Sequence, residues 1–144
     1  MDFFKEHHFH LINVDLPAFK KLMPLTNIAW GGQTYLRLMG RNTTTWDAVS
    51  KVETTNVTER YLYKYSEAEL QEFVQWITSM RAKGMKTFVI FHNDPQANSL
   101  FNGFQIRHIL QPDRKFKAPS ALIQKFPELQ PFTVAEALPD SLFG

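Results

Sequence analysis

The chain has 144 residues, of which 44% are hydrophobic and 21% charged, and its formal net charge is +2. This length predicts one domain, and this apolar fraction excludes wholesale disorder. The sequence contains no cysteine, which excludes disulfide bonds, thiolate metal sites and a cysteine nucleophile.

No apolar run approaches the roughly 20 residues that a membrane-spanning helix needs, so we expect no membrane association. Residues 1–15 carry histidines and acidic side chains where a secretory signal needs a basic stretch and an apolar run. We therefore expect a cytoplasmic protein. The lysines and arginines are spread along the chain, whereas a dedicated nucleic-acid binder normally shows a clustered basic stripe.

Two short strands are predicted in the first third of the chain. Residues 2–8 are typical of the end of a short helix, and residues 10–15 of a strand that is closed by a proline. Residues 17–32 contain two prolines and a Gly-Gly pair, which favours an irregular connection. Residues 34–41 alternate as a second strand does.

Within this second strand, Arg37 shares a face with Tyr35 and Met39, because side chains two positions apart point the same way. Residues 42–59 are rich in Thr and Asn and have no clear period. They indicate a long surface loop, and long ordered loops are often functional.

A helix is predicted from Ser66 onwards. Ser66 and Glu69 form a capping box, in which each side chain satisfies a backbone amide of the other residue. Gly84 stands where a C-terminal cap belongs. The apolar residues follow helical spacing: Leu70, Phe73, Val74, Ile77 and Met80.

Residues 86–94 contain a continuous apolar run, which is typical of a strand buried on both faces in a parallel sheet. Asp94 and Pro95 then predict a helix cap and a first helical residue. Pro112 stops this helix, one side of which carries Ala97, Leu100, Phe101, Phe104 and His108. Strands that alternate with helices indicate an α/β fold with a parallel sheet.

Residues 111–144 hold five prolines among scattered apolar residues. We expect a proline-rich tail packed on or beside the domain of residues 1–110, with a short helix near residues 120–125.

Three segments together resemble the C-terminal part of the YecE-like family, the domain of unknown function seventy-two. They are TYLRLMGRN, RYLYKYSEAEL and FVIFHNDPQANSLFNGFQI, and the upstream VDLPAF is similar to the family's Asp-Ser-Pro-Ala-Phe turn. Order and spacing match over about residues 2–110. The resemblance implies about three parallel strands with covering helices, the C-terminal portion of a TIM barrel. The family has no established reaction.

The chain departs from the family pattern in two side chains and in length. Met39 replaces the histidine of the family strand, and His92 replaces the first of two paired asparagines. A whole TIM barrel takes about 250 residues, so this chain would supply only its last three strands or so. Three explanations are open: a truncated gene product, which we favour, half of a barrel that a second chain completes, or a re-closed smaller α/β domain.

Candidate site residues stand where the strands end, because TIM barrels build their sites there and often bind phosphate after the last two strands. An arginine that points into a barrel is costly to bury without a carboxylate or an anionic ligand. We therefore predict an anion site, in which Arg37 and Arg41 clamp the anion and Asn93 orients it. The predicted site residues are Arg37, Gly40, Arg41, His92, Asn93 and Asp94.

Each of these residues also has a structural interpretation. Arg37 could form a salt bridge with Asp15 or Asp94, which would leave Arg41 solvated. Asp94 could simply cap a helix, and His92 could be a hydrogen-bonded structural histidine rather than a base or ligand. Asp15, His92 and Asp94 could share a divalent metal, but their spacing matches no metal motif and we assign no metal ligand.

Three functions remain open. The chain could bind a small anionic ligand or nucleic acid without catalysis. It could instead be a metal-assisted or acid–base hydrolase acting on a phosphorylated, nucleic-acid or sugar-like substrate, which rests on analogy with other barrels. Alone, it could also have no activity. The sequence identifies no cofactor.

Overall fold

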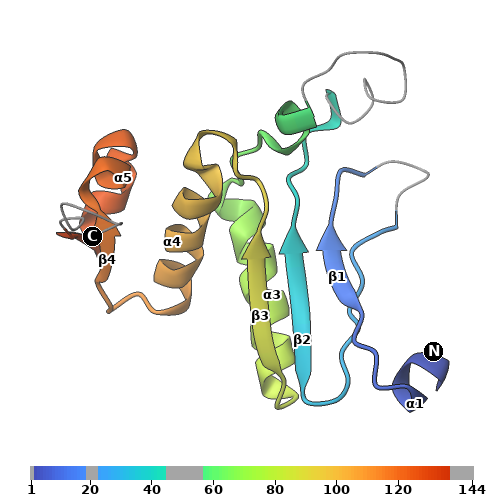
Figure 1. Cartoon of the computed structure of the whole chain (residues 1–144). Coiled ribbons are helices and arrows are strands. Elements are labelled where there is room, and N and C mark those ends of the chain that lie inside the picture. The colour runs from blue at the N-terminus through green and yellow to red at the C-terminus, as the bar shows by residue number, and fades with distance from the viewer. Residues whose placement is uncertain (1, 19–22, 45–56, 137–144) are drawn as a thin grey trace, which may run out of the picture.

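The computed structural model describes residues 2–18, 23–44 and 57–136. Its central element is a parallel sheet of three strands in the order β1-β2-β3, formed by Ile12–Asp15, Gln33–Leu38 and Lys86–Phe91 (Figure 1). Helix α1 spans Asp2–Glu6 and precedes the sheet. The predicted order of strands and helices and the α/β class are confirmed, although each strand is shorter than predicted.

Helix α3, Glu67–Ala82, begins with the predicted capping box. The Ser66 hydroxyl accepts from the Glu69 amide at 3.3 Å, and the Glu69 carboxylate accepts from the Ser66 amide at 2.8 Å. After the helix, Gly84 has φ +75°, a left-handed conformation that favours glycine. The predicted apolar stripe is buried at Leu70, Phe73, Ile77 and Met80.

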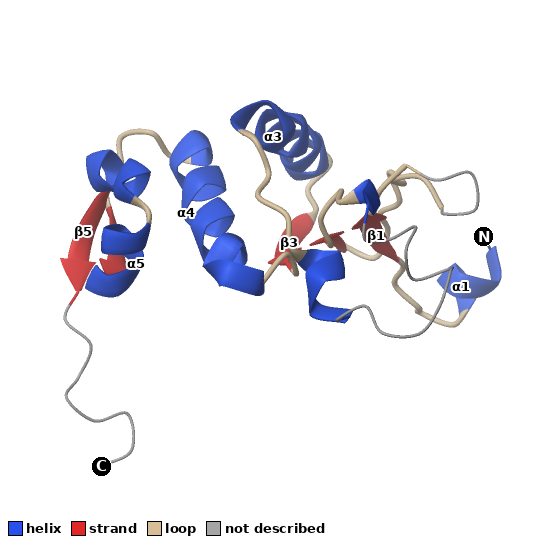
Figure 2. Ribbon diagram, turned by 90° about the horizontal axis from the view of Figure 1, so that it is seen from above, coloured by secondary structure: helices blue, strands red, loops and turns tan. Residues whose placement is uncertain are grey.

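Helix α3 covers one face of the sheet (Figure 2). Leu36 and Leu38 point into this face and are fully buried with the apolar side chains of α3. On the other face, Ile90 is 44% exposed. The prediction that residues 86–94 form a strand buried on both faces is therefore wrong, because the described helices cover only one face of the sheet.

Helix α4, Asn98–Leu110, begins later than predicted. Asp94 and Pro95 lead into a short 3-10 turn, η3 (Pro95–Ala97), in which Gln96 and Ala97 have φ near +65° and +62°. These positive φ angles separate the turn from α4. Asp94 stands at the N-cap position of this turn and Pro95 follows it, as predicted, but the Asp94 side chain makes no capping hydrogen bond to the backbone.

The tail contains more regular structure than the sequence predicts. The expected short helix is α5, Ser120–Lys125. Strands β4 (Phe116–Pro119) and β5 (Thr133–Glu136) form a separate parallel pair, joined by α5 and the 3-10 helix η4 (Pro127–Phe132). A second apolar cluster attaches this unit to α4 and consists of Phe101, Phe116, Leu122, Phe126, Leu129 and Phe132. Residues 45–56 of the predicted surface loop and residues 137–144 of the tail lie outside the described residues.

Candidate functional site at the strand ends

The predicted site residues gather at one edge of the sheet, because parallel strands all end on the same side. Arg37 lies on β2 itself, Gly40 and Arg41 follow β2, and His92, Asn93 and Asp94 follow β3. The strand register then divides these side chains between the two faces. Asp15 pairs with Leu38, whose side chain faces α3, whereas Arg37 pairs with Val14 and Ile90 on the uncovered face.

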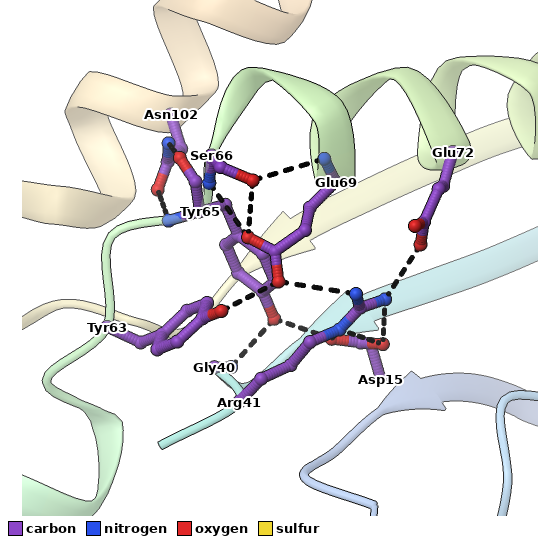
Figure 3. Close-up of polar contacts among 9 residues, drawn as sticks. All are labelled: Asp15, Gly40, Arg41, Tyr63, Tyr65, Ser66, Glu69, Glu72 and Asn102. Carbon is purple, nitrogen blue, oxygen red and sulfur yellow. Dashed lines mark hydrogen bonds and ion pairs between the residues drawn. The ribbon is translucent and has the colours of Figure 1, made fainter.

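On the covered side, Arg41 is held by three carboxylates (Figure 3). Its Nε lies 3.0 Å from Asp15 Oδ2 and its Nη2 lies 2.9 Å from Asp15 Oδ1, which makes a two-pronged contact. Glu69 and Glu72 accept from the same guanidinium at 3.3 and 3.2 Å. Burial by itself would lower the pKa of Arg41, but these carboxylates, Asp15 above all, outweigh it and raise the pKa.

Tyr65 lies beneath this ion pair and is 1% exposed. Its hydroxyl donates to Asp15 Oδ2 at 2.8 Å and accepts from the Gly40 amide at 2.8 Å. Burial, together with the charge of Asp15, raises the pKa of Tyr65 well above its ordinary value. Gly40 has φ +90°, and a Cβ there would lie 2.8 Å from Tyr63 Cβ, so this position needs glycine.

Glu69 connects the capping box to the ion pair. The Tyr63 hydroxyl donates to Glu69 Oε1 at 2.6 Å. Burial and this bond to a carboxylate raise the pKa of Tyr63 to about 12. Burial alone would raise the pKa of Glu69, but the hydrogen bonds from Tyr63 and Ser66 lower it. Glu69 is therefore held as an anion.

Asn93 and Asn102 form a buried amide link between β3, α4 and the segment before α3. Asn93 Nδ2 donates to the Tyr63 carbonyl and to Asn102 Oδ1, both at 2.8 Å. Asn102 Nδ2 donates to the Tyr65 carbonyl at 2.9 Å. Since both asparagines are fully buried and the Asn93 amide already donates twice, Asn93 positions the chain.

On the uncovered face, Arg37 contacts His92 rather than a carboxylate. Arg37 Nη2 lies 3.4 Å from His92 Nδ1, and the Tyr61 ring packs edge-on against the imidazole at 4.7 Å. A guanidinium can only donate, so Nδ1 accepts and a neutral His92 carries its proton on Nε2. Arg37 Nε is buried and has no hydrogen-bond partner within the described residues.

The structural alternative that paired Arg37 with Asp15 or Asp94 is wrong. Asp15 lies on the opposite face of the sheet and pairs with Arg41, which is therefore not simply solvated. Asp94 Oδ1 accepts from the Ser99 hydroxyl at 2.6 Å. Sequence reasoning missed the contribution of Tyr65, Glu69 and Glu72 to the ion pair, although the capping box had already located Glu69.

A pocket of about 480 Å³ opens beside the Asp15–Arg41 pair. Its other walls are apolar, formed by Leu16, Pro17, Ala18, Met23, Pro24 and Leu25. Asp15 and Arg41 are already paired with each other, so the pocket presents an apolar cavity without an unpaired charge at its wall. In residues 2–18, 23–44 and 57–136, no group of three or more His, Asp or Glu side chains is arranged so that it could hold a metal ion, and this includes Asp15, His92 and Asp94.

These features define an α/β protein with a parallel sheet and polar side chains gathered at the strand ends. Residues 1–127 match the model of the family described as a protein of unknown function, DUF72. The chain belongs to this family, as the resemblance implied.

Solved structures of the same family share the fold. A DUF72 family protein of Thermotoga maritima is 27% identical with a TM-score of 0.66, and the match covers 76% of this chain and 40% of that one. Two structures of a DUF72 family protein of Enterococcus faecalis are 24% and 23% identical, with TM-scores of 0.60 and 0.62. Their matches cover 75% and 76% of this chain and 39% and 40% of theirs. The chain thus spans about two fifths of the relatives' length.

A comparison with curated proteins found no match. Among the described helices, none combines the length and apolar character needed to cross a membrane.

Proposed function

We propose that this DUF72 protein binds a small phosphate-type anion through Arg37 and His92 at the uncovered face of the sheet. The observation that carries the proposal is the state of Arg37. Its Nε is buried without a partner, and no carboxylate in the described part of the chain pairs with it. Arg37 as a whole is half-buried, and a cation partly removed from water is costly unless an anion balances it, so this position favours an anionic ligand.

The donors suit a tetrahedral anion. The guanidinium presents a planar set of N–H groups that matches two oxygens at once. His92 accepts from Arg37 through Nδ1, which leaves Nε2–H as a second kind of donor. Arg37 lies on β2, and His92 directly follows the neighbouring strand β3, so the sheet supports both side chains.

The other predicted site residues take supporting roles in this proposal. The charge of Arg41 is balanced by carboxylates. The side-chain amide of Asn93 donates to the Tyr63 carbonyl and to Asn102. Gly40 makes room for Tyr63, and Asp94 accepts from Ser99. These four residues shape the strand ends, while Arg37 and His92 bind the ligand.

We also propose that the sheet is the C-terminal portion of a TIM barrel in a cytoplasmic protein. The strand order, the parallel register and the helices on one face support the barrel, in which Arg37 would point inward. A hydrolase remains the alternative. In that alternative His92, 3.4 Å from Arg37, would be the acid or base, because Asp15 and Asp94 are engaged elsewhere.

Phosphate titration monitored by thermal unfolding and by calorimetry tests the anion site. We expect saturable stabilisation of the natural chain by inorganic phosphate at constant ionic strength, since a ligand that binds only the folded state stabilises it. Arg37→Gln should weaken the affinity at least tenfold. Arg81→Gln, which removes an exposed arginine at the end of α3, should leave it unchanged. Equal phosphate affinity in the natural chain and a folded Arg37→Gln variant would refute the site.

A further inference from the structure

The contact between Arg37 and His92 depends on the charge of the imidazole. Arg37 Nη2 lies 3.4 Å from His92 Nδ1. A guanidinium carries N–H donors and no acceptor, so Nδ1 must offer its lone pair, which only a neutral imidazole can do. A protonated imidazole donates through both nitrogens, so two cationic donors would face each other across this distance. The contact therefore holds only while His92 is neutral.

An anion bound to Arg37 would remove this constraint. The guanidinium would direct its N–H groups at the oxygens of the anion, because charge-assisted hydrogen bonds are the stronger ones. Nδ1 of His92 would no longer be needed as an acceptor, so the imidazole could take a second proton and donate to the same anion. Two cationic side chains would then flank one ligand, and a doubly charged tetrahedral anion would balance both charges.

The other charged groups near His92 are screened or already engaged. The charged or titratable side chains on the segments next to it are Arg37 on β2, Glu59, Arg60 and Tyr61 on the 3-10 helix η2 (Val57–Tyr61), and Asp94. The Tyr61 ring packs edge-on against the imidazole. Glu59 is exposed, so water and salt screen its charge, and Arg60 has an interaction partner. Asp94 accepts from the Ser99 hydroxyl, whereas Arg37 contacts the imidazole nitrogen directly.

We propose that His92 takes up a proton when a doubly charged, phosphate-type anion binds at Arg37, so that the anion affinity of the site rises as the pH falls. This proposal rests on the proposed function, because it concerns the same anion. Histidine is the side chain that changes its charge between about pH 5 and 8. Since binding couplings are reciprocal, the proton strengthens anion binding by the factor by which the anion strengthens proton binding. The affinity is therefore highest below this pH range and decreases as His92 loses the second proton.

Calorimetric titration of the full chain with sulfate tests this coupling. Sulfate stays doubly charged across the range, whereas inorganic phosphate changes its own charge there. The sulfate affinity is measured at constant ionic strength at about pH 8 and about pH 5.5, on either side of histidine titration. Circular dichroism at both pH values confirms that each protein is folded. The natural chain is compared with His92→Gln, whose amide does not titrate, and with the control His7→Gln, which removes an exposed histidine after α1.

We expect sulfate to bind the natural chain and the His7→Gln variant at least about tenfold more tightly at the lower pH, as is typical of coupled sites. The sulfate affinity of the His92→Gln variant should be nearly independent of pH. Titrations repeated in two buffers with different heats of ionisation should show proton uptake on binding to the natural chain and none on binding to His92→Gln.

Failure of the coupling is distinguishable from failure of the anion site. Sulfate binding that Arg37→Gln weakens, but that is equally tight at both pH values or keeps its pH dependence in His92→Gln, would overturn the coupling and leave the site. Binding to the natural chain without proton uptake would overturn the coupling without the need for a variant. Sulfate binding that is absent at both pH values, or that Arg37→Gln leaves unchanged, would overturn the site and the coupling together.

Discussion

Removal of the Tyr65 hydroxyl is the sharpest test of the buried network. Tyr65→Phe keeps the ring, which packs edge-on against Phe73 at 5.4 Å between centroids. It removes one hydrogen bond to the Asp15 carboxylate and leaves the Gly40 amide without its acceptor. A bond to a charged group contributes about 1.5–3 kcal/mol, and an orphaned buried donor costs about 1–3 kcal/mol. Because the two losses overlap, we expect a decrease of roughly 2–4 kcal/mol in the free energy of unfolding.

Urea unfolding followed by circular dichroism measures this change. Tyr35→Phe is the matched control, because the Tyr35 ring stacks on Phe88 at 4.8 Å on the uncovered face and its hydroxyl bonds to no described residue. We expect the control to change the free energy of unfolding by less than about 0.5 kcal/mol, as is usual for substitutions away from buried networks. If Tyr65→Phe were as mild as Tyr35→Phe, the hydroxyl would not bridge Asp15 and Gly40 in solution.

Two further predictions concern Gly40 and Tyr63, which lie beside Tyr65 at the strand ends. Gly40→Ala should destabilise the chain by more than Gly84→Ala in the same urea assay. Both glycines have positive φ, which costs an alanine about 1–3 kcal/mol. Only at Gly40 would the new Cβ also meet Tyr63. Equal losses in the free energy of unfolding for the two variants would contradict this close contact. Raising the pH from 10.0 to about 12 should lower the free energy of unfolding of the natural chain by more than it lowers that of the Tyr63→Phe variant. In that range the unfolded state loses the Tyr63 proton while the folded state keeps it, so stability is complete below pH 10.0 and falls through the raised pKa; parallel pH profiles of the two proteins would contradict this.

Helix α3 could be predicted from sequence because its signals are local. The capping box needs only Ser66 and Glu69, three positions apart, and the apolar stripe repeats within the same 16 residues. The short helix α5 also lies where it was predicted, at residues 120–125. By contrast, the β4–β5 pair joins residues that lie 17 positions apart, Phe116 and Thr133, and no local sequence pattern predicts it.

The exposure of β3 could not be predicted, because it depends on whether another element covers the second face of the sheet. An apolar run such as residues 88–91 indicates a buried strand, and the covered face obeys this rule. Ile90 is exposed only because no helix or strand of the described chain lies over it. The start of α4 was missed for a different reason, since Gln96 and Ala97 adopt positive φ angles that neither residue type normally favours.

The two arginines show how strand register decides function within one short segment. Arg41 follows β2 on the side of α3, where Asp15, Glu69 and Glu72 surround it. These carboxylates are therefore unavailable to Arg37, which the alternation of the strand directs to the other face. There its one polar contact within the described residues is a histidine. This difference between the two faces is why we propose that an anion at the strand ends binds Arg37 and not Arg41.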